Sequence, residues 1–136
     1  MLRSRRGASA VEFALTLPIV VVLAAITVEW GWVLSQQAWI HAAARDSTRF
    51  AVELDPNDFD VEQQAIQSAG EWLAGYQFDC ADTLCAIDAQ VGHILGRDAL
   101  TVLIDVDYQP IFGLIPVPES LHGESTYLLK YQEINF

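Results

Sequence analysis

Hydrophobic residues are distributed unevenly along the 136-residue chain. Residues 13–28 are almost wholly aliphatic, and Glu29 is the only charged residue between positions 13 and 40. A bilayer core of about 30 Å requires roughly 20 residues of helix, which residues 10–32 supply. The pattern therefore predicts a transmembrane helix. Tryptophans are enriched at membrane interfaces, and three of them stand near the far end of this run: Trp30, Trp32 and Trp39.

The helical pattern continues beyond the apolar run and becomes amphipathic. Residues 38–51 mix small residues with spaced apolar ones and contain no Gly or Pro. Pro56 disfavours helical geometry in Asp55. Pro18 lies inside the apolar run, where a proline kinks or locally opens a helix. We expect one helix from Ala8 to about Glu53.

A second amphipathic helix is predicted after this break. Asp58 or Asp60 is the expected N-cap, because Asp60 and Gln63 have the spacing of a capping box. Gly75 is the expected end. The apolar stripe follows the 3.6-residue period closely and comprises Val61, Ala65, Ile66, Ala69, Trp72, Leu73 and Tyr76.

Three extended segments follow, at residues 86–91, 100–108 and 125–131. The second alternates apolar and polar positions. Residues 109–123 contain three prolines and two glycines, which indicates a long irregular connection. The predicted fold class is α+β, with a small three-stranded antiparallel sheet packed on the two helices.

The charge distribution gives this arrangement an orientation. Seven basic residues stand against 18 acidic ones, for a net charge of -11, which argues against a nucleic-acid partner. Arg3, Arg5 and Arg6 precede the apolar run, and basic flanks of a membrane segment are retained in the cytoplasm. We expect a single-pass inner-membrane protein with a cytoplasmic N-terminus and a periplasmic acidic domain.

The two cysteines, Cys80 and Cys85, fall in the segment that this topology places in an oxidising compartment. A disulfide is the expected state. Closing so short a loop would add about 2 kcal/mol of stability in the chain-entropy model. A zinc site would need two further ligands, for which His93 is the only nearby candidate, so we expect no metal there.

No catalytic constellation is evident. His41, His93 and His122 are far apart in sequence, and none has a Ser, Cys or carboxylate motif around it. Asp105 and Asp107 share one face of the predicted strand, where they form either a solvated face or a cation site. We expect a structural protein without a cofactor, and not an enzyme.

The segment Arg5–Phe13 joins a basic stretch, a glycine, small residues and Glu12 to the apolar run. A carboxylate at the edge of a membrane span costs on the order of 2 kcal/mol or more unless it is paired. Glu12 therefore either has a partner or sits at headgroup level. A cleaved secretory signal fits poorly, because no Ala-x-Ala pattern follows the apolar run.

These features resemble the TadE-like minor pseudopilins of tight-adherence (Tad, type IVb) pili. The resemblance is carried by RRGASAVEFALTLPIVVVLAAITVEWGWVLSQQAWIHAAARDSTRFA and, more weakly, by the segment 102–110 and the closing strand with Glu133. It implies cleavage by a prepilin peptidase between Gly7 and Ala8, which makes Glu12 the fifth mature residue. Phe13 stands where the major pilins of this branch commonly have Tyr, and the chain is far longer than those proteins.

The resemblance implies a leader at 1–7, a transmembrane and assembly helix at 8–34 and a periplasmic pseudopilin domain at 35–136. Glu12 and Phe13 would act in assembly. The implied function is a minor structural subunit in pilus assembly and adhesion. Its partners would be the inner membrane, the prepilin peptidase, sister pseudopilins or the major pilin, and the assembly platform. The alternative is a membrane-anchored periplasmic binding or adhesive protein that is never assembled into a pilus.

Overall fold

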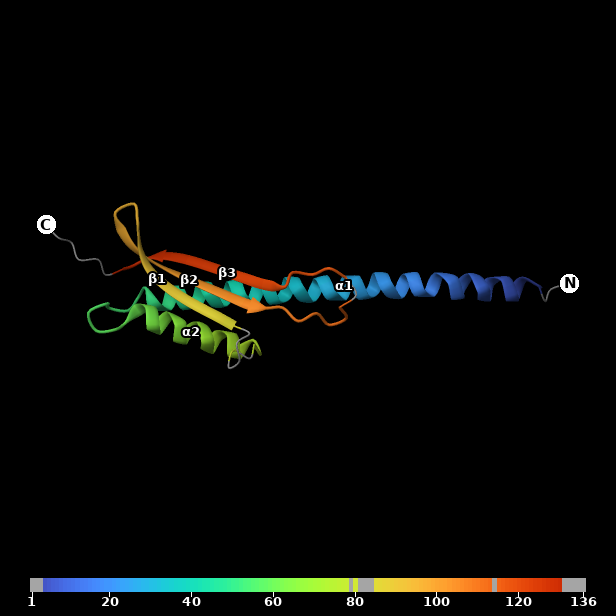
Figure 1. Cartoon of the computed structure of the whole chain (residues 1–136), viewed down its shortest axis with the longest axis horizontal. Coiled ribbons are helices and arrows are strands. Elements are labelled where there is room, and N and C mark those ends of the chain that lie inside the picture. The colour runs from blue at the N-terminus through green and yellow to red at the C-terminus, as the bar shows by residue number, and fades with distance from the viewer. Residues whose placement is uncertain (1–3, 79, 81–84, 114, 131–136) are drawn as a thin grey trace. The chain divides into compact units, whose positions relative to one another are not determined.

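A computed structural model of the chain describes residues 4–78, 80, 85–113 and 115–130, with only the backbone described for residues 4–8. The order of elements is α1 (Ser4–Ala51), α2 (Val61–Gly75), β1 (Cys85–Ile94), β2 (Arg97–Asp107) and β3 (Ser120–Leu128) (Figure 1). Two helices and one three-stranded antiparallel sheet confirm the predicted α+β class.

The chain forms two compact units. The smaller comprises Met1–Leu34 and Pro110–Val117, and the larger comprises Ser35–Gln109 and Pro118–Phe136. Helix α1 contributes to both units and continues through Pro18. The segment Pro110–Val117, which the sequence shows only as irregular connection, belongs with the N-terminal part of α1.

In the larger unit, the sheet has the order β1-β2-β3, with β2 in the centre. The register places Ile104 opposite Ile87 on one side and Gly123 on the other. Leu95 and Gly96 form the two-residue turn between β1 and β2, with φ of 53° and 77°. Positive φ at both residues is what a type I′ hairpin turn requires.

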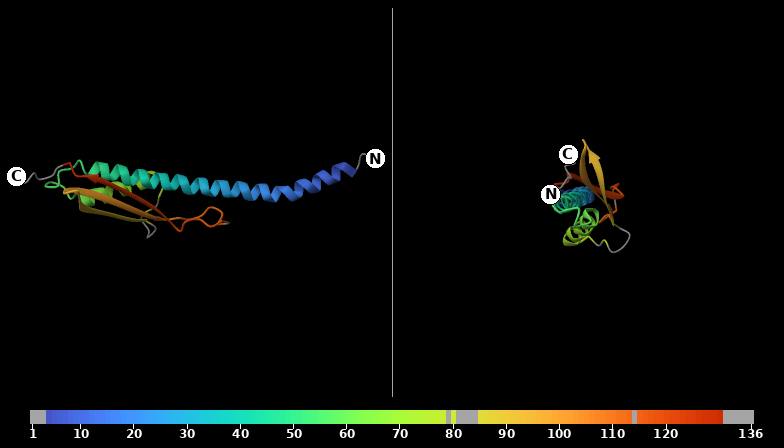
Figure 2. Two further views of the ribbon diagram at one scale, coloured as in Figure 1. Left: turned by 90° about the horizontal axis from the view of Figure 1, so that it is seen from above. Right: turned by 90° about the vertical axis from the view of Figure 1, so that its left-hand side faces the viewer.

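The core of the larger unit is built from periodic stripes, as expected. Strand β2 buries alternate residues from Leu100 to Val106, and α2 buries one residue per turn: Val61, Ala65, Ala69 and Leu73. Helix α1 contributes small or β-branched residues at helical spacing: Ile40, Ala43, Ala44, Ser47, Thr48 and Ala51. Figure 2 shows both helices beside the sheet in this unit. Within the predicted α2 stripe, Ile66 and Trp72 are instead 37% and 44% exposed.

Helix α2 also covers one edge of the sheet. Its N-cap is Asp60, whose Oδ1 accepts a hydrogen bond from the Gln63 backbone N–H at 3.2 Å. One turn in, Glu62 Oε1 accepts the backbone N–H of Val91 at 2.8 Å. Val91 lies in the edge strand β1, where an unpaired N–H would otherwise invite another strand.

Several predicted boundaries are wrong. Strand β1 extends to Ile94 and not only to residue 91, and β2 begins at Arg97, three residues before the expected start. Strand β3 begins at Ser120 and ends at Leu128, so residues 120–123 are strand and not irregular connection. The glycines and prolines of residues 109–123 indicate an irregular connection, but Gly123 pairs with Ile104 and packs against Ile40 of α1 with too little room for a side chain. Helix α1 ends at Ala51, two residues before the expected Glu53.

Candidate membrane and assembly site

The N-terminal part of α1 exposes apolar side chains in every direction. Between positions 11 and 23 the large hydrophobic residues are 45–70% exposed: Val11, Phe13, Leu15, Leu17, Ile19, Val20, Val21, Val22 and Leu23. The helix is long and apolar enough to cross a membrane. An exposed apolar surface of this size is unusual in water and is typical of a membrane or protein contact.

The predicted assembly residues lie at the start of this surface. The side chains of Glu12 and Phe13 are exposed, with Phe13 64% exposed. Gly7 and Ala8, the predicted cleavage site, lie within the backbone range of α1, and only their backbone is described. Whether the peptidase cuts there stays a prediction.

Glu29 is the charged residue whose role sequence reasoning missed. Its side chain is fully buried. Its Oε1 accepts the backbone N–H of Ile111 at 2.9 Å, and its Oε2 accepts that of Phe112 at 2.8 Å. Charge-assisted bonds of this kind are stronger than neutral ones. The available signal was that Glu29 interrupts a run of 28 residues, from 13 to 40, that has no other charge.

Apolar side chains surround the Glu29 carboxylate. Helix α1 contributes Val22, Ala25 and Ile26, and the segment Pro110–Val117 contributes Phe112 and Ile115. Together they line a cleft of about 200 Å³. The smaller unit therefore consists of the apolar part of α1 and a short apolar segment that is hydrogen-bonded to it through the Glu29 carboxylate.

The tryptophans do not share one environment. Trp30 and Trp32 are 42% and 38% exposed, as residues at a membrane interface would be. Trp39 instead packs inside the larger unit, stacked on Tyr76 with ring centroids 6.0 Å apart and edge-on to Phe78 at 6.4 Å. Trp39 is therefore half-buried beside the end of α2, and its place at a membrane interface stays a prediction.

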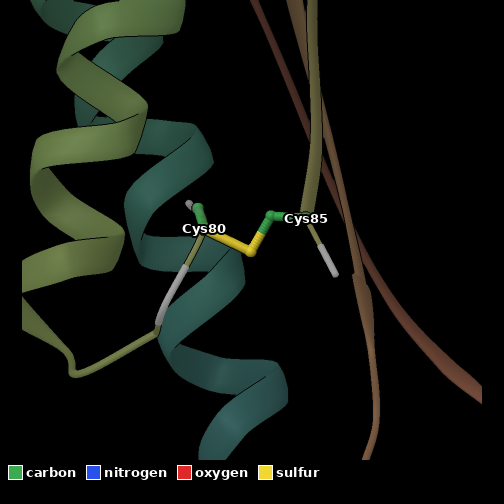
Figure 3. Close-up of a disulfide and its surroundings, with 2 residues drawn as sticks. All are labelled: Cys80 and Cys85. Carbon is green, nitrogen blue, oxygen red and sulfur yellow. A yellow bond between two sulfur atoms is a disulfide. The ribbon is translucent and has the colours of Figure 1, made fainter. Parts of the chain in front are cut away.

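Cys80 and Cys85 form the predicted disulfide, with their Cα atoms 5.0 Å apart (Figure 3). Cys80 follows α2, and Cys85 is the first residue of β1. The bond therefore closes the connection between these two elements. His93 is engaged elsewhere, with its Nδ1 against the Asp98 carboxylate.

The remaining histidines and Asp105 have partners on the surface, and Asp107 is exposed. His122 Nδ1 lies 2.9 Å from Asp105 Oδ1, across the β2–β3 pair. His41 Nε2 lies 2.9 Å from Gln37 Nε2. Asp105 thus faces a histidine, and no group of three potential metal ligands occurs in the part of the chain that the structure describes.

The family model described as TadE-like protein matches residues 7–49, so the resemblance is confirmed over nearly the whole of α1. No curated protein and no solved structure matches the chain.

Proposed function

We propose that the chain is a minor pilin-like subunit of a Tad (type IVb) pilus, with a structural and not an enzymatic role. The observation that carries the proposal is the coincidence of two features on one helix. The TadE-like match covers residues 7–49, and the same helix exposes an all-round apolar surface between Val11 and Leu23. Such a helix suits first a bilayer and later the packed helices of a filament.

In this proposal, α1 anchors the chain in the inner membrane with the basic N-terminus in the cytoplasm. The acidic α+β unit then lies in the periplasm, where the Cys80–Cys85 disulfide is stable. A prepilin peptidase removes residues 1–7, and the mature subunit joins sister pseudopilins or the major pilin at the assembly platform. Incorporation into the pilus gives it a part in assembly and adhesion.

Intact-mass spectrometry of the protein isolated from producing cells tests this function. We expect a mature chain beginning at Ala8. Its mass should be lower by two hydrogens than that of the same chain with both cysteines reduced. Alkaline carbonate should leave the mature form in the membrane fraction before assembly. A retained leader, or an N-terminus elsewhere, would contradict the processing step.

Crosslinking in the same cells tests assembly separately. We expect captured sister pseudopilins or assembly-platform proteins. A chain that stays in the membrane uncleaved and captures none of them is the anchored binding or adhesive protein that the sequence left as the alternative.

A further inference from the structure

The segment Pro110–Val117 places two apolar side chains on the outside of the smaller unit. Ile111 is 50% exposed and Phe112 is 49% exposed, although the backbone N–H of each is bonded to Glu29. The segment contains no charged residue, in a chain with 18 acidic ones. Its surface therefore differs from that of the acidic domain into which it is inserted.

The position of this segment along α1 fixes the depth that it reaches. It shares the cleft with Val22, Ala25 and Ile26, which belong to the apolar run. Val22 precedes Trp30 by eight residues, which is about 12 Å along a helix at 1.5 Å per residue. If Trp30 marks the outer interface, Phe112 lies below it beside Val22, and the backbone of Ile111 lies at the level of Glu29, one residue below Trp30.

Backbone at this depth needs partners from the protein. An irregular segment in hydrocarbon cannot bond water, so its N–H groups must be satisfied internally. Glu29 supplies an acceptor to two consecutive N–H groups, and the segment in turn buries a carboxylate that would be expensive beside lipid. The helix thus satisfies the backbone N–H groups of the segment, and the segment shields the carboxylate of the helix from lipid.

We propose that Pro110–Val117 is a second membrane contact, a short loop that enters the outer leaflet beside α1 with Ile111 and Phe112 against lipid acyl chains. The two hydrogen bonds to the Glu29 carboxylate hold the loop against α1. The inference rests on the proposed membrane anchoring by α1. The occupant is lipid because the exposed face of the loop is continuous with the exposed apolar surface of the same helix.

Lipid-dependent fluorescence quenching tests the loop directly. The full-length chain is reconstituted in phosphatidylcholine vesicles with an environment-sensitive dye on Ile111→Cys, with and without doxyl-labelled lipid. Val20→Cys is the control for the membrane span, and Leu95→Cys, which replaces a side chain 99% exposed in the hairpin turn, is the control for water. The unsubstituted chain should take up no dye, because both native cysteines are in the disulfide.

We expect quenching at position 111 to be several-fold greater than that at position 95, with position 20 as the reference for a side chain inside the membrane. Quenching at 20 with none at 111 would overturn the loop insertion and leave the anchor intact. Absence of quenching at 20 would overturn the proposed anchoring itself. A dye at 111 that is shielded from water and yet not quenched by lipid would indicate a protein partner, and so would also overturn the inference.

The role of the two Glu29 hydrogen bonds is tested by Glu29→Gln in the Ile111→Cys chain. A glutamine side chain replaces one of the two carboxylate oxygens by an NH2 donor, so in the same orientation one of the two backbone N–H groups faces a donor and loses its acceptor. We expect quenching at 111 to fall by more than half while quenching at 20 stays unchanged. Glu53→Gln, the same substitution at an exposed residue just beyond the end of α1, should leave both unchanged. Unaltered quenching at 111 in Glu29→Gln would show that Glu29 does not hold the loop. The dye-labelled chains that keep Glu29 test the loop insertion whether or not this variant folds.

Discussion

Gly123 is the residue at which the larger unit tolerates least change. A Cβ at this position would lie 2.7 Å from Ile40 Cγ2 and 3.1 Å from the Ile40 carbonyl oxygen. The carbonyl belongs to helix α1 and cannot rotate away as a side chain can. We expect Gly123→Ala to lower the free energy of unfolding by about 1 to 3 kcal/mol, measured by thermal unfolding of the full-length chain in detergent.

Gly92 in β1 is the matched control for this prediction. A Cβ there would meet no atom within 4 Å, so Gly92→Ala should change stability by less than about 0.5 kcal/mol. Equal effects of the two substitutions would show that the contact between β3 and α1 is not what fixes a glycine at position 123.

Leu95 has a backbone conformation that its side chain disfavours. It is 99% exposed and has a φ of 53°, at the first position of the hairpin turn. Asn and Gly adopt this conformation more readily, and the left-handed region costs other residues about 1 to 2 kcal/mol. We expect Leu95→Asn to raise the unfolding temperature by the equivalent of about 1 kcal/mol.

Leu95→Ala separates the backbone effect from the loss of an exposed apolar side chain. Alanine keeps the Cβ, so the strain remains and the unfolding temperature should not rise. A gain equal to that of Leu95→Asn would place the cause in the side chain.

At the scale of an element, the start of α2 depends on one cap. The Asp60 carboxylate accepts the Gln63 N–H, which otherwise has no partner within the helix. Asp60→Ala should lower the free energy of unfolding by about 1 kcal/mol.

Asp58, the other N-cap candidate in the sequence, is the control. Its backbone N–H donates a hydrogen bond to the Asp55 carbonyl oxygen at 3.1 Å, and Asp58→Ala keeps this bond. Asp58→Ala should therefore lower the free energy of unfolding by less than half as much as Asp60→Ala. A larger effect of Asp58→Ala would indicate that Asp58 is the N-cap.

The disulfide acts on the connection between α2 and β1. It closes a loop with a sequence separation of 5, which restricts the unfolded chain only modestly. We expect the double substitution of Cys80 and Cys85 by Ser to cost about 2 kcal/mol and to leave the far-UV circular dichroism spectrum unchanged. An unfolding transition that is unaffected by reductant in the parent chain would contradict this expectation.

At the scale of the whole molecule, Glu12 is expected to act between subunits. Cleavage after Gly7 would create a positive α-amino group at Ala8, near the apolar zone, where an amine and a carboxylate are each costly when unpaired. At about 4 Å and an effective dielectric near 20 their attraction is on the order of 4 kcal/mol before desolvation. Glu12→Gln should therefore leave cleavage and folding intact and weaken subunit association, measured by crosslinking in producing cells.

Glu53→Gln removes the same charge from an exposed residue just beyond the end of α1, and should assemble at parental levels. If Glu12→Gln is correctly cleaved and also assembles at parental levels, the amine-pairing role is wrong. Glu12 would then be a residue seated at the lipid headgroups.

What the sequence determined by itself are the features that depend on neighbours along the chain. The apolar run predicts α1, the alternation from Leu100 onward predicts β2, and the Asp60–Gln63 spacing predicts the cap of α2. The cysteine pair follows from five residues of separation. In each case the physical cause, which is periodicity, capping or loop closure, acts over a few residues and can be read locally.

Only the tertiary structure decided the features that join distant segments. Glu29 binds backbone groups 82 and 83 residues away, so its burial could not be read from the apolar residues beside it. Gly123 lies within β3, paired with Ile104 of β2 and packed against Ile40 of α1, whereas its local sequence indicates an irregular connection. Trp39 stacks on Tyr76, 37 residues away in sequence, because α2 ends beside it. These contacts depend on where the chain returns in space, and a single charge, glycine or tryptophan carries no local signal of that return.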